Sequence, residues 1–251
     1  MKTIKRILSI ILIVAIAAVA LVIWQGYEMY SDAVAKVSVE EKAAEIMKQD
    51  HYTTYEELPE TYVKAVIAAE DRRFQYHKGF DIISTARAAW RNFKSKEIVE
   101  GGSTITQQLG RIMYFYQEKK YSRKVAEVLV AGRIEELYDK DEIFELYVNT
   151  IYFGSGYYNV YDASMGYFGK KPADMNDYEC TMLAGIPNAP SVYSPDVNPT
   201  LAEQRRQQVL TCMAEAGYIQ PGDIEKQGNK NRDHIKRPRY FLYSHGNLKR
   251  F

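Results

Sequence analysis

An uninterrupted apolar run near the N-terminus, residues 7–24, limits what this chain can fold into more than any other feature. None of these residues is charged, and as a helix rising about 1.5 Å per residue the run is about 27 Å long, close to the ~30 Å hydrocarbon core of a bilayer. Residues 1–6 carry three basic side chains, and positive charge favours the cytoplasmic side of a membrane. The sequence therefore predicts a cytoplasmic basic tail at 1–6, a single-pass transmembrane anchor at 7–24 and an extracytoplasmic remainder.

A cleaved signal peptide is the alternative interpretation of this run, because the triplet AVA at 18–20 has the form of a cleavage site. The triplet lies inside the run, however, and the apolar residues 21–24 follow it. Since a cleavage site normally follows the apolar region, the pattern favours an uncleaved signal-anchor. Trp24 and Tyr27 then fall where aromatic side chains commonly mark the outer membrane interface.

The composition of the chain restricts its class and its partners. Its 251 residues are 46% hydrophobic and 26% charged, which is typical of a globular protein with a substantial core. The formal net charge of +1 gives no overall field that would attract nucleic acid, so no nucleic-acid partner is expected. Cys180 and Cys212 lie in apolar, helical contexts and are expected to be free thiols. Neither a CxxC nor an HExxH pattern occurs, so the sequence does not predict a dedicated zinc site.

Helical patterns dominate after the anchor and alternating strand patterns are nearly absent, so the predicted fold class is mostly α. A polar, helix-prone stalk is expected at 25–51 and a compact domain at 52–220. Residues 221–251 are polar and basic without a helical period, which predicts a basic C-terminal tail. Two alternatives are equally compatible with that tail. It contacts anionic lipid headgroups or wall polymers, or it is a solvated segment with no role.

The segment TYVKAVIAAE, residues 61–70, places a carboxylate on an otherwise apolar helix face. Val66 and Ile67 share this face, and Glu70 continues it at i+4 and i+3. Because loss of hydration makes a carboxylate a better proton acceptor, Glu70 is a candidate general base. The pattern alone supports equally a helix end at which Glu70 pairs with a neighbouring arginine. His77 and Asp81, a few residues later, are expected to be structural.

A second segment, EGGSTITQQLGR at 100–111, offers hydroxyls and two carboxamides next to a flexible glycine pair. Ser103 is expected to be a helix N-cap, which would leave free backbone amides to face an anion. No G-K-[ST] follows the glycines, so this is not the phosphate-binding loop of nucleotide-binding proteins. Considered alone, the segment is better explained as an ordinary turn and cap.

A third segment, SRKVAEVLV, begins at Ser122 and predicts a helix that buries a second carboxylate. Glu127 shares a face with apolar residues of the following turns, and Arg123 and Lys124 lie one turn earlier on the same side. Such a cluster can bind a pyrophosphate directly or through a divalent metal. A surface ion pair is the simpler explanation when the segment is considered alone.

Five segments in this order resemble the five motifs of the family-51 peptidoglycan glycosyltransferases: EDRRFQYHKGFD, GGSTITQQL, RKVAE, KDEIFELYVNTIYFGSGYY and LAGIPNAPSVYSP. The resemblance spans about Tyr62 to Tyr218, and GGSTITQQL is its most specific part. It implies a lysozyme-like, two-lobed helical domain with a cleft and one lobe on the outer membrane surface. It also implies the reaction, in which lipid II is polymerised into β-1,4 glycan strands with inversion and release of polyprenyl pyrophosphate.

The resemblance implies a role for each candidate residue of the first and third motifs. Glu70 matches the catalytic glutamate and would accept the proton of the attacking sugar hydroxyl. Arg123 and Lys124 match residues that would bind the pyrophosphate leaving group. Glu127 would hold Mg²⁺ or Mn²⁺, or would orient the side chains of Arg123 and Lys124.

Residues of the second motif are implied to contact the pyrophosphate or the sugars, namely Ser103, Gln107 and Gln108. The family usually has Lys-Asn after QQL-x, whereas Arg111 and Ile112 stand here. Arg111 keeps the positive charge and can contact two phosphate oxygens, so its function is expected to be retained.

The resemblance also implies a membrane-bound enzyme whose partners are lipid II, the growing glycan strand and other cell-wall synthesis or division proteins. The segment 86–96, which contains Trp90 and Phe93, is a candidate membrane-dipping surface, with an amphipathic core helix as the alternative. The transpeptidase signatures S-x-x-K and K-T-G do not occur, so a monofunctional enzyme is expected.

Two other functions compete with the transferase hypothesis. A lysozyme-like hydrolase would also use one buried glutamate, but cleaving a glycan requires no pyrophosphate site such as the Arg123, Lys124 and Glu127 cluster. A non-catalytic scaffold for wall assembly would not need both Glu70 and Glu127.

Overall fold

The computed structural model describes residues 2–95 and 101–224, and these form helices and no strand. The mostly α prediction is therefore confirmed for this part of the chain. The α-helices are α1 (Lys2–Lys36), α2 (Val39–Met47), α3 (Glu60–Glu70), α4 (Ile82–Ser95), α5 (Ile105–Tyr114), α6 (Arg123–Leu137), α7 (Lys140–Val148), α8 (Val160–Phe168), α9 (Asp177–Gly185), α10 (Pro190–Tyr193) and α11 (Pro199–Glu215). The short 3-10 helices are η1 (Tyr55–Glu57), η2 (Phe74–Tyr76), η3 (Pro172–Asp174) and η4 (Ile186–Asn188).

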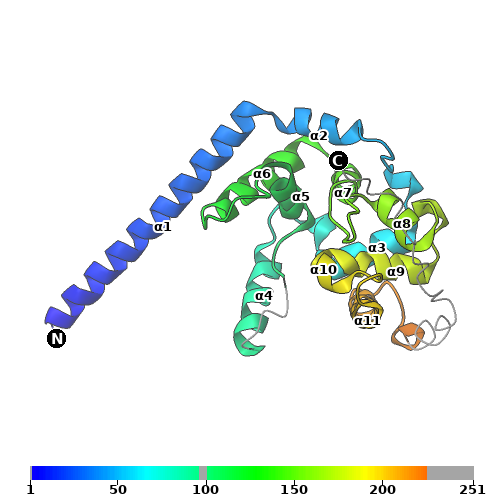
Figure 1. Cartoon of the computed structure of the whole chain (residues 1–251). Coiled ribbons are helices and arrows are strands. Elements are labelled where there is room, and N and C mark those ends of the chain that lie inside the picture. Colours follow the sequence, from blue (N-terminus) through cyan, green and yellow to red (C-terminus); the bar gives the residue numbers. More distant parts are fainter. Residues whose placement is uncertain (1, 96–100, 225–251) are drawn as a thin grey trace, which may run out of the picture.

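Helix α1 extends away from the rest of the molecule as one continuous rod (Figure 1). Its apolar residues 7–24 are exposed almost throughout, and by length and composition the helix can cross a membrane. An apolar surface of this size is unfavourable in water, so α1 is a candidate membrane anchor.

The C-terminal part of α1 and helix α2 pack on the body of the protein. Gly26 is buried against α6, where an added Cβ would lie 2.4 Å from Val125 Cβ. The three buried residues of α2 are Val39, Ala43 and Ile46, and all join the hydrophobic core. The segment expected as a stalk thus contributes to the core, while the domain boundary placed at residue 52 stays a prediction.

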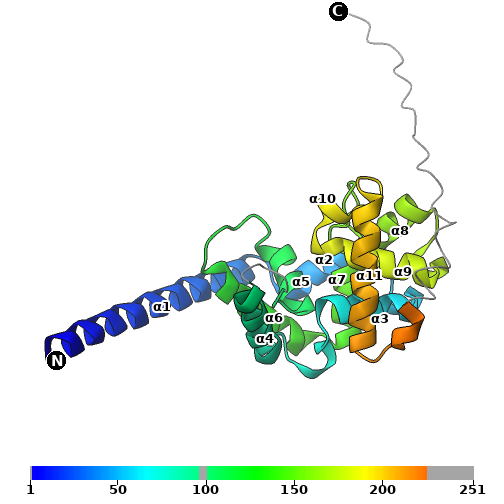
Figure 2. The same ribbon diagram turned by 90° about the horizontal axis from the view of Figure 1, so that it is seen from below.

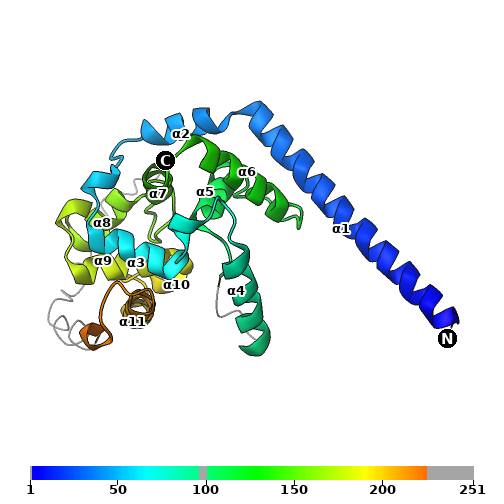
Figure 3. The same ribbon diagram turned by 180° about the vertical axis from the view of Figure 1, so that it is seen from behind.

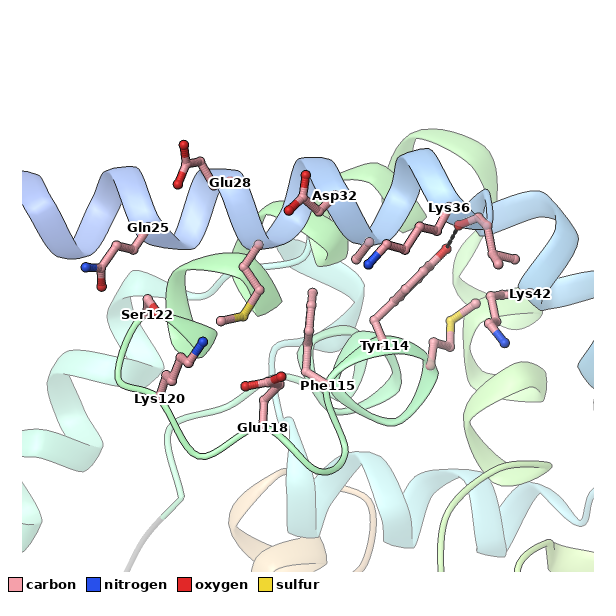
Figure 4. A pocket seen from close by; sticks show the side chains of 14 residues that line it. Gln25, Glu28, Asp32, Lys36, Lys42, Tyr114, Phe115, Glu118, Lys120 and Ser122 are labelled. Carbon is pink, nitrogen blue, oxygen red and sulfur yellow. Dashed lines mark hydrogen bonds between the residues drawn. The ribbon is translucent and has the colours of Figure 1, made fainter.

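A hollow of about 700 Å³ separates α1 from the link between α5 and α6 (Figure 4). Charged side chains of both signs surround it, among them Glu28, Asp32 and Lys36 of α1. Tyr114 closes one end by donating a hydrogen bond of 3.0 Å to the carbonyl oxygen of Val37. Helix α1 therefore contacts the body on both sides of this hollow.

The body divides into two groups of helices. Helix α3 packs against α9 and α11, while α5 packs against α6 and α7. Figure 2 shows α4 and α6 on the side nearer α1, with α8, α9 and α11 on the opposite side. This division agrees with the predicted two-lobed helical domain. Helix α4 projects from the body toward the same side as the N-terminal end of α1 (Figures 1 and 3).

The buried face of α3 follows the predicted periodicity. Val63, Val66 and Ile67 are buried, and Phe74 extends the same apolar surface beyond the helix end. The helix ends at Glu70, so the carboxylate lies at the edge of this surface. Its position there brings it to a groove between α3, α4, α5 and α11.

Gly79 provides a test of how the turn after α3 is built. Its φ is +85°, and an added Cβ would lie 2.7 Å from the backbone carbon of Ala131. We expect Gly79→Ala to lower the free energy of unfolding by about 1–3 kcal/mol, because it combines backbone strain with a clash against α6. Gly132→Ala is the control: it lies inside α6 with open space around it, and should stabilise by about 0.5–1 kcal/mol. Equal midpoints for both variants in thermal unfolding would contradict this account.

Candidate active site

A groove of about 920 Å³ opens where the end of α3, helices α4 and α5, and helix α11 meet. It contains four of the sequence-predicted site residues, Glu70, Ser103, Gln108 and Arg111. Basic side chains predominate among its charged lining residues, which are Glu70, Asp71, Arg72, Arg87, Arg91, Lys94, Arg111, Arg205 and Glu215. Such a groove favours an anionic ligand.

Glu70 is held in the groove by one oxygen and leaves the other without a hydrogen bond. Gln108 Nε2 donates to Glu70 Oε2 over 3.0 Å. Glu70 Oε1 is buried and has no hydrogen-bond partner, and Arg205 Nη2 lies 3.7 Å from it. The helix end of the alternative interpretation is found at Glu70, but the arginines that follow it pair elsewhere, Arg72 with Glu215 and Arg73 with Asp81. A carboxylate with an open oxygen in a groove can accept a proton from a bound hydroxyl.

Tyr147 orients the amide that holds Glu70. It is fully buried on α7, and its hydroxyl donates to Gln108 Oε1 over 3.3 Å. Burial raises the pKa of Tyr147 well above its usual value, and the charge of Glu70 raises it further. The phenol therefore stays protonated and donates to Gln108 Oε1, which directs the NH₂ group of Gln108 toward Glu70.

Asp71 joins the end of α3 to the start of α5. Its Oδ2 accepts a hydrogen bond of 3.0 Å from Ile105 N and lies 2.8 Å from His77 Nε2. The side chains of Asp71 and His77 are both buried, which fits the structural role expected of His77. No local pattern indicates this contact, because Asp71 and Ile105 come from different motifs. The contact fixes Glu70 relative to α5.

Asp81 begins helix α4. Its carboxylate accepts hydrogen bonds from Ile83 N at 3.0 Å and Ser84 Oγ at 2.6 Å, and Arg73 Nε lies 2.9 Å away. Burial raises the pKa of Asp81, but the hydrogen bonds and the charge of Arg73 outweigh burial, so the net shift is downward. These contacts fit the structural role expected of Asp81.

The N-cap of α5 is Thr104, and the prediction of Ser103 in this role is wrong. Thr104 Oγ1 accepts from Gln107 N at 3.0 Å and donates to the carbonyl oxygen of Gly79 at 2.7 Å. Gln107 completes the capping box by accepting from Thr104 N, and its side chain is fully buried. Gln107 thus does not line the groove, although the resemblance suggested a substrate contact.

Glu127 is 2% exposed and lies between two cations. Arg123 Nε is 3.0 Å from Oε1, in a geometry that does not make a hydrogen bond, and Lys124 Nζ donates to Oε2 over 3.0 Å. Lys124 Nζ also donates to Ser103 Oγ over 2.7 Å. The structure therefore joins the second and third motifs next to the groove. Because half of the Lys124 side chain is exposed, it remains accessible to an anion.

These residues do not form a metal site by themselves. Within residues 2–95 and 101–224, no three His, Cys, Asp or Glu side chains are grouped to hold a metal ion. Both oxygens of Glu127 face cations, which compensates its charge without a metal. The expected Mg²⁺ or Mn²⁺ at Glu127 stays a prediction, and we derive no chemical step from it.

Arg111 was predicted as a site residue from the sequence, whereas Arg205 was not. Arg111 lies just after GGSTITQQL and lines the groove, and its guanidinium has no hydrogen bond or ion pair with any residue the structure describes. It is thus available to an anionic ligand. Arg205 lies on α11, far along the chain from Glu70, and no local pattern indicates that the two side chains meet.

Helix α4 presents large apolar side chains to solvent. Trp90 and Phe93 are 68% and 78% exposed, and Ile82 is 70% exposed. The alternative of a buried amphipathic core helix is therefore not supported, since Ala88 is its only buried residue in the described range. Residues 96–100, at the end of the candidate membrane-dipping segment, lie outside the described residues.

Asp71 offers a direct test of the junction between α3 and α5. We expect Asp71→Ala to lower the free energy of unfolding by about 2–5 kcal/mol, because Ile105 N and His77 would each lose a buried partner at about 1–3 kcal/mol. Asp174→Ala removes an exposed aspartate and should change stability by less than about 0.5 kcal/mol. Chemical denaturation of both variants measures the difference, and similar midpoints would refute the structural role.

Comparison with known proteins identifies relatives along most of the chain. The family described as Transglycosylase matches residues 39–214. Penicillin-binding protein 1A of Aquifex aeolicus is 44% identical over 179 residues, which cover 71% of this chain and 25% of that protein. A Cupriavidus necator protein named "Putative transglycosylase" is 44% identical over 174 residues, covering 69% of this chain and 75% of that protein. Penicillin-binding protein 1F of Bacillus subtilis is 41% identical over 182 residues, covering 72% and 26%.

The chain thus spans about a quarter of the length of these penicillin-binding proteins and three quarters of the Cupriavidus protein. The matched range contains both glutamates, every predicted site residue and every groove-lining residue except Glu215. On this evidence the chain belongs to the transglycosylase family.

Proposed function

We propose that this protein is a peptidoglycan glycosyltransferase that polymerises lipid II into β-1,4 glycan strands. The observation that supports this most directly is Glu70, whose Oε1 makes no hydrogen bond, in a groove whose charged lining residues are mainly basic. Membership of the transglycosylase family supports the same reaction class. A carboxylate base beside cations is what a transfer of sugar from a pyrophosphate requires.

Glu70 acts as the general base in this proposal. The 4-hydroxyl of the acceptor sugar attacks the anomeric carbon of the donor, while its proton passes to Glu70. The bond from the anomeric carbon to the pyrophosphate oxygen breaks as the new glycosidic bond forms, so the configuration inverts. Gln108 and Tyr147 keep the carboxylate oriented during this step.

The leaving pyrophosphate carries the negative charge that develops in the transition state. Arg123 and Lys124 bind its oxygens in the proposal, with Ser103 placed beside them by its hydrogen bond to Lys124. Glu127 holds both cations in position. Arg111 contributes a further guanidinium from within the groove. Preorganised cations of this kind stabilise the transition state without rearrangement.

The protein is placed in the bacterial cell membrane with its N-terminus in the cytoplasm. Helix α1 serves as the single-pass anchor and the groove lies outside. Helix α4, with Trp90 and Phe93 exposed, contacts the outer leaflet and brings the groove to the lipid-linked substrate. The partners in this proposal are lipid II, the growing strand and other cell-wall proteins.

Hydrolysis of existing glycan is the second candidate function, since one groove carboxylate could also act as an acid. The cluster of Arg123, Lys124 and Glu127 favours transfer over hydrolysis, because glycan cleavage releases no pyrophosphate. A scaffold role explains neither the open oxygen of Glu70 nor this cluster.

The central test compares the wild type with Glu70→Gln on labelled lipid II and on preformed glycan. We expect polymer from lipid II with the wild type, a loss of at least about 100-fold in the variant because the base is absent, and no cleavage of glycan. Glu136→Gln, which changes an exposed glutamate on α6, should retain full activity. Polymerisation that survives Glu70→Gln would rule out this residue as the base, and cleaved glycan without polymer would favour hydrolysis.

Metal dependence is tested by chelation. We expect EDTA to leave polymerisation within about threefold of its starting rate, because Arg123 and Lys124 already supply positive charge at Glu127. The measurement is the rate of polymer formation before chelation, after it, and after addition of Mg²⁺ or Mn²⁺. A loss that either ion restores would instead support a metal held by Glu127 and the substrate phosphates.

A further inference from the structure

Arg205 is the cation that faces the open oxygen of Glu70. Its Nη2 lies 3.7 Å from Glu70 Oε1, and the two side chains are only 12% and 10% exposed. This separation exceeds the ~2.7–3.2 Å of a hydrogen bond, so Oε1 lies buried beside Arg205 without a hydrogen-bond partner. Because both groups are largely removed from water, their attraction is stronger than that of a surface pair.

The guanidinium of Arg205 is itself fixed by three contacts. Nε donates to the carbonyl oxygen of Gly185 at 3.3 Å, and Nη1 donates to Gln208 Oε1 at 3.1 Å. The ring of Tyr193 lies 5.8 Å from Cζ, within the range of a cation–π contact. These contacts occupy Nε and Nη1, which leaves Nη2 directed at Glu70.

Gly185 provides the space through which Arg205 reaches the groove. An added Cβ would lie 2.9 Å from Arg205 Cγ and 3.4 Å from a methyl carbon of Val209. Its φ of −81° is open to any residue, so the backbone does not require glycine here. Glycine is therefore required here because a side chain would occupy the space of Arg205 Cγ. Gly185 belongs to the LAGIP segment of the fifth motif.

The two charged residues that follow Glu70 in the chain are engaged elsewhere. Asp71 binds the start of α5, and Arg72 pairs with Glu215. Gln108 holds only Oε2 of Glu70. Among the residues the structure describes, Arg205 is thus the group that restrains the Oε1 side of this carboxylate.

We propose that Arg205 is a positioning residue that fixes the orientation of the base Glu70, and that Gly185 is required because it lets Arg205 reach that carboxylate. This inference rests on the proposed function of Glu70. A carboxylate held on one side by Gln108 and on the other by Arg205 cannot rotate away from the acceptor hydroxyl. Misplacement of a reacting group by about 1 Å can cost about 100-fold in rate, so the restraint has a measurable value.

The first experiment measures lipid II polymerisation by the full-length Arg205→Ala variant in detergent or vesicles. We expect kcat to fall about 10- to 100-fold with KM within about twofold, because orientation of the base is lost while substrate binding remains. Millimolar guanidinium chloride, too dilute to unfold the protein, should restore part of the rate. Arg205→Lys should retain more activity than Arg205→Ala. Arg133→Ala, which removes an arginine paired with Glu40 and Glu136 outside the groove, is the control with unchanged kcat.

Gly185→Ala tests the same idea with every charge retained. The variant should still fold, because the higher helix propensity of alanine in the last turn of α9 offsets part of the clash with Arg205 Cγ. Its kcat should nevertheless fall at least about fivefold, since the new methyl group displaces Arg205 Cγ. Unchanged kcat in a folded Gly185→Ala protein would contradict the role of this glycine.

A double-mutant cycle separates this inference from the proposed function. Arg205→Ala and Glu70→Gln should shift the unfolding midpoint non-additively, because each removes one member of the same pair. If the midpoint shifts are non-additive but the wild-type protein makes no polymer, the ion pair is upheld and the proposed function is refuted. Additive shifts would refute the pair. A raised KM with unchanged kcat in Arg205→Ala would overturn the inference, since Arg205 would then bind substrate instead of positioning Glu70.

Discussion

The buried carboxylate of Asp71 holds the two parts of the site together. It follows the last residue of α3 and accepts a hydrogen bond from the first residue of α5, Ile105, while His77 contacts the same oxygen. A carboxylate at a helix N-terminus is favoured both by the free amides and by the helix dipole. Because this contact sets the distance between α3 and α5, Glu70 and Gln108 can meet across the groove.

Helix α5 then connects two polar groups with different chemistry. From its second turn Gln108 reaches Glu70, while Ser103, just before the helix, reaches Lys124. The first group contains a carboxylate with an open oxygen, and the second contains a carboxylate saturated by cations. The proposed reaction needs both kinds of group, a proton acceptor for the nucleophile and positive charge for the leaving group.

The motifs contain structural residues beside the groups that bind substrate. Gln107 and Gln108 are neighbours of the same type, yet Gln107 completes a buried capping box and Gln108 lines the groove. Asn159 is a similar case: its φ is −149°, and its Oδ1 caps α8 by accepting a 2.7 Å hydrogen bond from Asp162 N. The left-handed positions are Gly154, Ser155 and Gly156, a few residues earlier.

The sequence by itself determined the features that depend on local periodicity. The long apolar run of α1, the helical class of the body and the apolar faces that carry Glu70 and Glu127 all follow from spacing along one helix. The motifs also supplied Glu70, Ser103 and Gln108 of the groove lining, because their order and composition resemble one family. These features need no knowledge of how the helices pack.

Only the tertiary structure decided which partner each of these side chains meets. Thr104 rather than Ser103 caps α5 because Thr104 also reaches the carbonyl oxygen of Gly79 in a distant turn. Arg205 faces Glu70 because α11 packs against α3, a contact between segments far apart in the chain. Pairings of this kind depend on the arrangement of whole helices, and no local spacing in the sequence encodes them.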